Sequence, residues 1–98
     1  MDRSHVIATL QANQAALQQL GVRHAALFGS VARGEARPGS DVDIMVDIDP
    51  EIGLGVFEYV GIVQALESLF SGRVDVSNRQ AQKDHVRASA ERDAVYAF

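Results

Sequence analysis

Residues 29–49 read GSVARGEARPGSDVDIMVDID, and the second half of this stretch decides the fold. From residue 41 to residue 49, aliphatic side chains alternate with acidic ones, and a single methionine interrupts the acidic series. Strict alternation is the pattern of a β-strand that turns one face toward a core. The core face would carry Val42, Ile44, Val46 and Ile48. The opposite face would carry Asp41, Asp43, Met45, Asp47 and Asp49.

The Gly29-Ser30 pair directly follows the apolar residues 22–28, which are predicted as a second strand. A helical turn is expected from Ser30 onward. Free backbone N–H groups at such a turn attract an anion, and glycine lets a phosphate approach the backbone. Arg33 could add a charge-assisted contact, and Ser40 could donate a hydrogen bond where the acidic strand begins. This segment is therefore predicted to bind a phosphate group.

Asp41 and Asp43 are two residues apart on a strand, so their side chains share a face and their Cα atoms lie ~6.6 Å apart. Mg²⁺ prefers carboxylate oxygens, so such a pair can hold one ion or share two. Without metal, repulsion should raise the pKa of one carboxyl group. Asp47 and Asp49 lie ~13 Å or more beyond Asp43 along the strand and are expected to be solvated.

The remaining elements follow from apolar spacing and from glycine, proline and serine positions. The pattern predicts helices at 4–20 and 55–70, a strand at 73–77, a weakly helical stretch at 80–92 and an apolar tail at 94–98. Gly61 lies inside the second helix, where close packing against a neighbour would offset its poor helix propensity. We expect an α+β fold with a small mixed sheet of at least three strands and helices packed on one side.

Length and composition limit the function. The 98 residues, 47% of them hydrophobic, suit one domain over 1–98. The lack of cysteine excludes a disulfide framework, a thiolate zinc site and a cysteine nucleophile, and makes the cytoplasm the expected location. A net charge of −4 argues against direct nucleic-acid binding or attachment to anionic membranes. No apolar run is long enough to span a bilayer.

Gly29-Ser30, ten intervening residues and then Asp41-Val42-Asp43 resemble the signature of the DNA polymerase β-like nucleotidyltransferase superfamily. The fuller string GSVARGEARPGSDVDIMV, with a later GRVDV, resembles the minimal nucleotidyltransferases, antitoxins that are often encoded beside a HEPN-domain toxin. The resemblance covers nearly the whole chain and implies the polymerase β-like fold. By the same resemblance, Asp75 is the third carboxylate of the site.

The resemblance implies transfer of AMP from ATP to a hydroxyl group of a partner protein, expected to be a HEPN toxin held in a hetero-oligomer. It implies two Mg²⁺ ions on Asp41, Asp43 and Asp75, which are also the catalytic residues. It assigns the nucleotide to Gly29 and Ser30, and the residue pattern adds Arg33 and Ser40. Asp75 is also a candidate to accept the proton of the attacking hydroxyl group.

Two other functions compete with this one. The chain could neutralise its partner by occlusion, as a binding module with a weak or inactive nucleotide site. It could also modify a small molecule, as the aminoglycoside nucleotidyltransferases do, which it resembles in motif only. The second ranks last because the chain has no room for the substrate domain of those enzymes.

Overall fold

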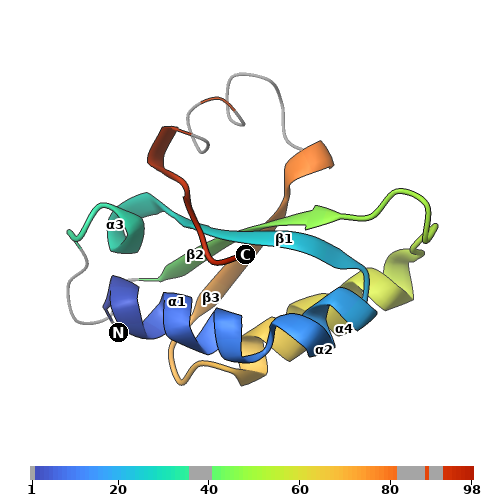
Figure 1. Cartoon of the computed structure of the whole chain (residues 1–98), viewed down its shortest axis with the longest axis horizontal. Helices are drawn as coiled ribbons and strands as arrows, with labels where there is room; N and C mark the ends of the chain where they lie inside the picture. Colours follow the sequence, from blue (N-terminus) through green and yellow to red (C-terminus); the bar gives the residue numbers. More distant parts are fainter. Residues whose placement is uncertain (1, 36–40, 82–87, 89–91) are drawn as a thin grey trace.

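The computed structural model describes residues 2–35, 41–81, 88 and 92–98. Its centre is a mixed four-stranded sheet in the order β3-β2-β1-β4 (Figure 1). The strands are β1 (Val22–Phe28), β2 (Val42–Ile48), β3 (Val74–Asn78) and β4 (Val95–Tyr96). β1 pairs antiparallel with β2 and β4, whereas β2 and β3 are parallel. The acidic strand predicted from alternation is thus β2, in the middle of the sheet.

Three helices cover one face of the sheet (Figure 1). They are α1 (Arg3–Ala12), α2 (Gln14–Gln19) and α4 (Val56–Ser68). A parallel strand pair needs a crossover connection, and α4 supplies it between β2 and β3. A single helical turn, α3 (Gly29–Ala32), follows β1, and a short 3₁₀ helix, η1 (Arg79–Ala81), follows β3. The α+β prediction with helices on one side is confirmed.

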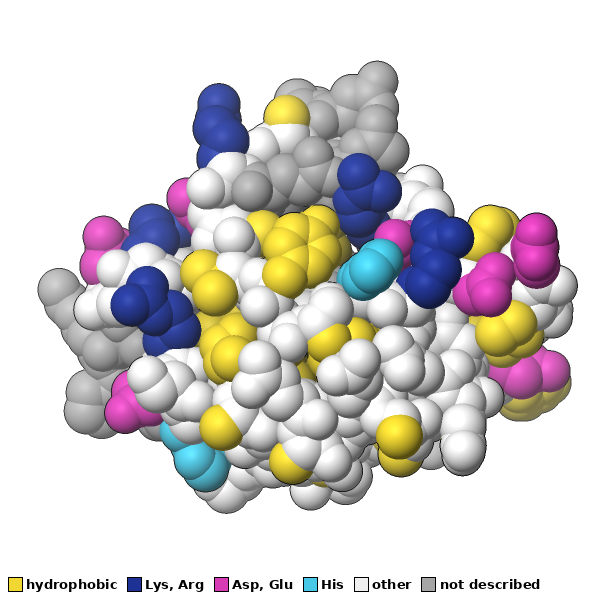
Figure 2. Space-filling model, in the orientation of Figure 1, with side chains coloured by type: hydrophobic (Ala, Val, Ile, Leu, Met, Phe, Trp, Pro, Cys, Tyr) yellow, Lys and Arg dark blue, Asp and Glu magenta, His cyan; other side chains and the backbone are white. Residues whose placement is uncertain are grey.

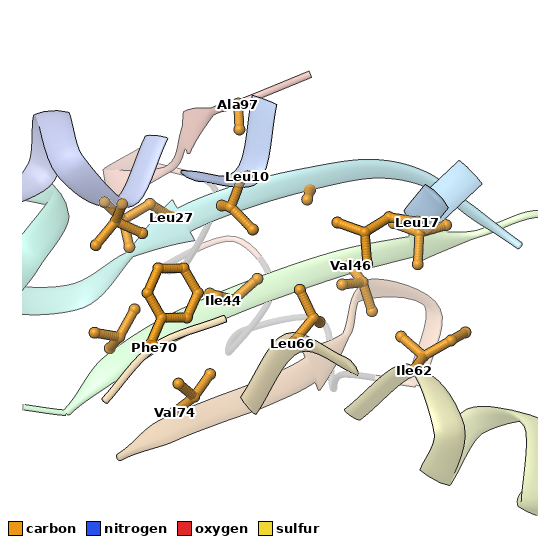
Figure 3. Close-up of a cluster of buried hydrophobic side chains, with 14 of the residues drawn as sticks. Leu10, Leu17, Leu27, Ile44, Val46, Ile62, Leu66, Phe70, Val74 and Ala97 are labelled. Atoms are coloured by element: carbon orange, nitrogen blue, oxygen red, sulfur yellow. The ribbon is translucent and has the colours of Figure 1, made fainter. Parts of the chain in front are cut away.

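The core lies between this helical layer and the sheet (Figure 3). Leu10 of α1, Leu17 of α2 and Leu66 of α4 pack in one cluster with Ile44 and Val46 of β2, and each of these side chains is at most 2% exposed. The aliphatic face of β2 predicted from alternation is therefore the core face, and it holds the acidic face in a fixed orientation on the other side of the sheet. No helix in the described residues is both long enough and apolar enough to cross a membrane.

Two elements differ from the sequence prediction. The expected helix at 4–20 is two helices, because the Asn13 side chain donates to the carbonyl of Thr9 and replaces regular helical bonding at that point. The apolar tail contains β4, which joins the sheet through a hydrogen bond from the Ala97 amide to the Ala25 carbonyl. Most of the stretch predicted as weakly helical, 82–87 and 89–91, lies outside the described residues.

The second face of β2 is more covered than expected. Asp47, predicted to be solvated, is only 8% exposed. Its carboxylate accepts hydrogen bonds from the guanidinium group of Arg23 in β1 and from the side-chain amide of Gln80 in η1, and these two side chains shield it from solvent. Met45 on the same face packs with Ala26 in a small second cluster. Asp41 and Asp43 near the start of β2 remain partly exposed, as does Asp49 beyond its end. Of these, Asp41 and Asp43 form the predicted pair, so the candidate site lies at the start of β2.

Candidate active site

The candidate site forms where three adjacent strands present their residues at one level. Asp43 of β2 is the register partner of Phe28 at the end of β1 and of Asp75 in β3. The sheet therefore places Gly29, which follows Phe28, beside Asp43 and places Asp75 on its other side. Asp43 and Asp75 are 32 positions apart in the chain, and they meet because β3 pairs parallel to β2 in this register.

Gly29 is required by both backbone conformation and space. Its φ is +77°, a left-handed conformation that favours glycine. A Cβ atom at this position would collide with the Asp43 carboxylate. The glycine thus lets that carboxylate lie directly against the turn between β1 and α3.

Asp43 lies among other negative charges and is partly removed from water. The pKa of its carboxyl group is raised, first by burial and then by the charges of Asp75 and Asp41, while Arg33 lowers it. The pKa rise predicted for one member of the Asp41–Asp43 pair thus falls on Asp43. Such a carboxylate gains most from a nearby cation.

Arg73 supplies one cation to this cluster. Its Nε atom lies 3.9 Å from Asp41 Oδ2 and 4.0 Å from Asp75 Oδ1. The position is fixed by the backbone, because the amide of Val42 donates to the Arg73 carbonyl at 2.9 Å and joins the starts of β2 and β3. Its side chain is 77% exposed, so it can move away without breaking the core.

The donor chemistry fits a hard divalent ion. Asp43 of β2, Asp75 of β3 and Asp41 directly before β2 offer the carboxylate oxygens that Mg²⁺ takes, and a guanidinium group already lies near two of them. Within the described ranges, no three Asp, Glu or His side chains form a ready-made metal-binding group. Asp41, Asp43 and Asp75 are therefore neighbours whose carboxylates would have to draw closer around an ion.

The other residues predicted to bind the nucleotide differ in where they lie and in what they contact. Ser30 lies at the start of α3, half-buried, one residue from Gly29. Arg33 forms ion pairs with Glu35 at 3.1 Å and with Asp93 at 2.8 Å, so a phosphate would have to compete with two carboxylates for it. Ser40 lies outside the described residues.

The sequence pattern also indicates Arg73 as a site residue, although it was not among the predicted ones. It precedes Asp75 by two residues on a strand, and a period of two places both side chains on the same face. The same period of two places Asp41 and Asp43 on one face. Applied to residues 73–75, it places the Arg73 guanidinium group beside Asp75.

The chain is similar to known nucleotidyltransferases over most of its length. The model of the family "Nucleotidyltransferase domain" matches residues 11–97. Protein adenylyltransferase MntA of Thermococcus cleftensis is 35% identical over 79 residues, which are 81% of this chain and 78% of that protein. A solved structure of a minimal nucleotidyltransferase is 32% identical, with a TM-score of 0.81, over 97% of this chain and 95% of the other.

A more distant neighbour supports the fold alone. The crystal structure of a toxin-antitoxin with AMP-PNP has a TM-score of 0.69 at 18% identity and covers 90% of this chain and 72% of the other. The sheet order, the glycine-serine turn beside β2 and the match over residues 11–97 agree with one another. The chain therefore belongs to the nucleotidyltransferase domain family, as an enzyme of the minimal nucleotidyltransferase type with the polymerase β-like fold.

Proposed function

We propose that this enzyme transfers AMP from ATP to a hydroxyl group of a partner protein and thereby acts as an antitoxin. In this reaction the acceptor oxygen bonds to the α-phosphorus, the bond from that phosphorus to the bridging α–β oxygen breaks, and pyrophosphate leaves. Mg²⁺ bound at the site would neutralise charge on the phosphates. Asp41, Asp43 and Asp75 would hold the metal, and Gly29, Ser30, Arg33 and Ser40 would bind the nucleotide.

The observation that carries the proposal is the meeting of Asp43 and Asp75 at one register level of β2 and β3. Repulsion between the two carboxylates contributes to the raised pKa of Asp43, so this arrangement lowers the stability of the folded protein. A loss of stability of this kind is typical of functional sites, and carboxylates that serve a cation-dependent reaction would account for it. Phosphoryl transfer needs charge stabilisation and positioning more than it needs a protein nucleophile.

We propose that Asp75 also takes the proton of the attacking hydroxyl group. It lies on β3, the edge strand of the described sheet, and its side chain is 49% exposed. An acceptor residue can therefore reach it without entering the protein. Asp75→Asn should flatten the pH dependence of AMP transfer as well as slow it, whereas an unchanged pH profile with weakened metal binding would leave only a ligand role.

The choice of a protein acceptor draws on the relatives. The Thermococcus cleftensis relative is named a protein adenylyltransferase, and the neighbour with AMP-PNP is a toxin-antitoxin structure. These support ATP as the donor and a toxin as the acceptor. By the motif resemblance we take that toxin to be a HEPN-domain protein, bound to this chain in a hetero-oligomer in the cytoplasm.

Position-specific labels on ATP test the reaction. The chain, Mg²⁺ and the purified product of the neighbouring gene are incubated with ATP labelled at the α- or the γ-phosphate. Label from the α-position should appear on the partner and label from the γ-position should not. Asp43→Asn should abolish transfer, and Asp49→Asn, the same change beyond the far end of β2, should leave it intact. Neutralisation of the partner without transfer, retained in Asp43→Asn, would favour occlusion instead.

A further inference from the structure

The outer face of α4 carries an unusual set of exposed apolar side chains. Phe57 is 90% exposed and Val56 is 76% exposed, with Ile52 at 49% in the preceding loop and Val60 at 43% one turn further along α4. Residues three and four apart share a helix face, so Val56, Phe57 and Val60 form one continuous surface on α4, and Ile52 lies in the loop that leads into it. We call it the α4 surface. Large exposed apolar patches on a small protein mark interaction sites.

Gly61 gives a second, independent indication. It lies four residues after Phe57, on the same side of the helix, where glycine costs stability relative to alanine. The sequence predicts close packing of the helix against a neighbour at this position. In the described structure, however, a Cβ atom at Gly61 would meet nothing within 4 Å outside its own helix backbone and chain neighbours. The missing side chain therefore leaves space on the outside of the protein, beside the most exposed aromatic ring.

Charge indicates what covers this surface. Glu58 lies on α4 next to Phe57, and Glu51 lies beside Ile52 in the loop; both are exposed. Figure 2 shows acidic and hydrophobic side chains together at the right edge of the molecule, over the loop that leads into α4. Anionic lipid would repel these carboxylates, and a second copy of the chain itself carries a net charge of −4. A partner with basic residues around an apolar centre would be attracted.

We propose that the α4 surface docks a helix of a partner protein, with an apolar side chain packed against Phe57 and Gly61 and with Lys or Arg residues facing Glu51 and Glu58. The proposal rests on the proposed function in one respect, since the partner is taken to be the acceptor protein. A cavity of about 610 Å³, lined in part by Val56 and Tyr59, adjoins the surface and offers room for a further side chain.

Docking there would hold the partner without blocking chemistry. Asp43 lies near the start of β2, whereas α4 begins beyond the end of that strand, so the strand alone separates them by ~17 Å. A folded domain readily spans this distance. Loss of the α4 surface should therefore raise KM for the protein acceptor and leave kcat almost unchanged.

The test uses the full chain and the purified product of the neighbouring gene as the probe, with Kd measured by calorimetry. Phe57→Glu should weaken binding by about tenfold or more. Gly61→Leu should weaken it similarly while raising the thermal midpoint, a combination that misfolding cannot produce. Gln19→Glu, which adds the same charge at an exposed position of α2, should bind as the original chain does. Asp43→Asn should bind normally and transfer no AMP.

Several results would overturn the proposal. They are absence of binding by the original chain, equal affinity of all variants, self-association that Phe57→Glu abolishes, or binding to anionic vesicles that depends on Phe57. Failure of AMP transfer by the original chain with docking intact would instead refute the proposed function and leave the α4 surface in place. The two proposals can thus fail separately.

Discussion

Replacing Arg73 by glutamine should strengthen metal binding at the carboxylates. The Arg73 guanidinium lies 3.9 Å from Asp41 and 4.0 Å from Asp75, so a divalent ion must compete with it. Each exposed ion pair of this kind contributes ~0.2–1 kcal/mol, and the 77% exposure of the side chain argues against a larger value. Two pairs together give about 1 kcal/mol, or about fivefold in affinity.

The assay is Mn²⁺ binding in the absence of nucleotide, followed by electron paramagnetic resonance of the free ion. Arg23→Gln is the matched control, because it removes the same charge from a residue paired with Asp47 toward the far end of β2. Circular dichroism checks that both variants remain folded. Equal affinities of Arg73→Gln and the original chain would refute the competition, and weaker binding by the variant would mean that Arg73 supports the site instead.

Three further predictions concern stability and the turn at β1. Asp43→Asn should raise the melting temperature of the metal-free protein at neutral pH. The raised pKa of Asp43 means that its contribution to stability is present below the usual carboxyl pKa and is lost as the pH rises through the folded value, so the gain should vanish in acid, as a pH series of melting curves would show. Gly61→Ala should stabilise the fold by about 1 kcal/mol in urea unfolding, and a loss would mean that the position is packed internally. Gly29→Ala should abolish transfer and destabilise the protein by ~1 kcal/mol or more, because it combines a positive φ with a collision at Asp43; normal activity would show that the turn is not so constrained.

The sequence predicts well those features whose pattern is local. The alternation at 41–49 identified β2 and its core face, because a strand has a period of two. The Gly29-Ser30 pair was predicted to follow a strand and to open a helical turn, and α3 begins there directly after β1. Asp75 followed only from the resemblance, since nothing local shows which strand pairs with β2.

Tertiary contacts explain the errors. Alternation places Asp47 on the face of β2 opposite the core, so the sequence predicts a solvated side chain. In the structure, Arg23 and Gln80, which are far from Asp47 in the sequence, form hydrogen bonds to it and shield it from water. β4 spans two residues, too few for a periodic signal, and it exists because β1 offers a free edge. Sequence spacing also cannot show that, within the described part of the chain, a Cβ at Gly61 would meet nothing within 4 Å beyond its own helix backbone and chain neighbours.

The most direct measurement of the central claim is the intact mass of the partner protein after incubation with this chain, ATP and Mg²⁺. The account predicts a gain of one or more whole AMP units, absent when Asp43→Asn replaces the original chain and absent when a chelator removes the divalent ion. An unchanged mass for a partner that is nevertheless neutralised, or a gain that persists in Asp43→Asn, would contradict the claim that these carboxylates drive nucleotidyl transfer.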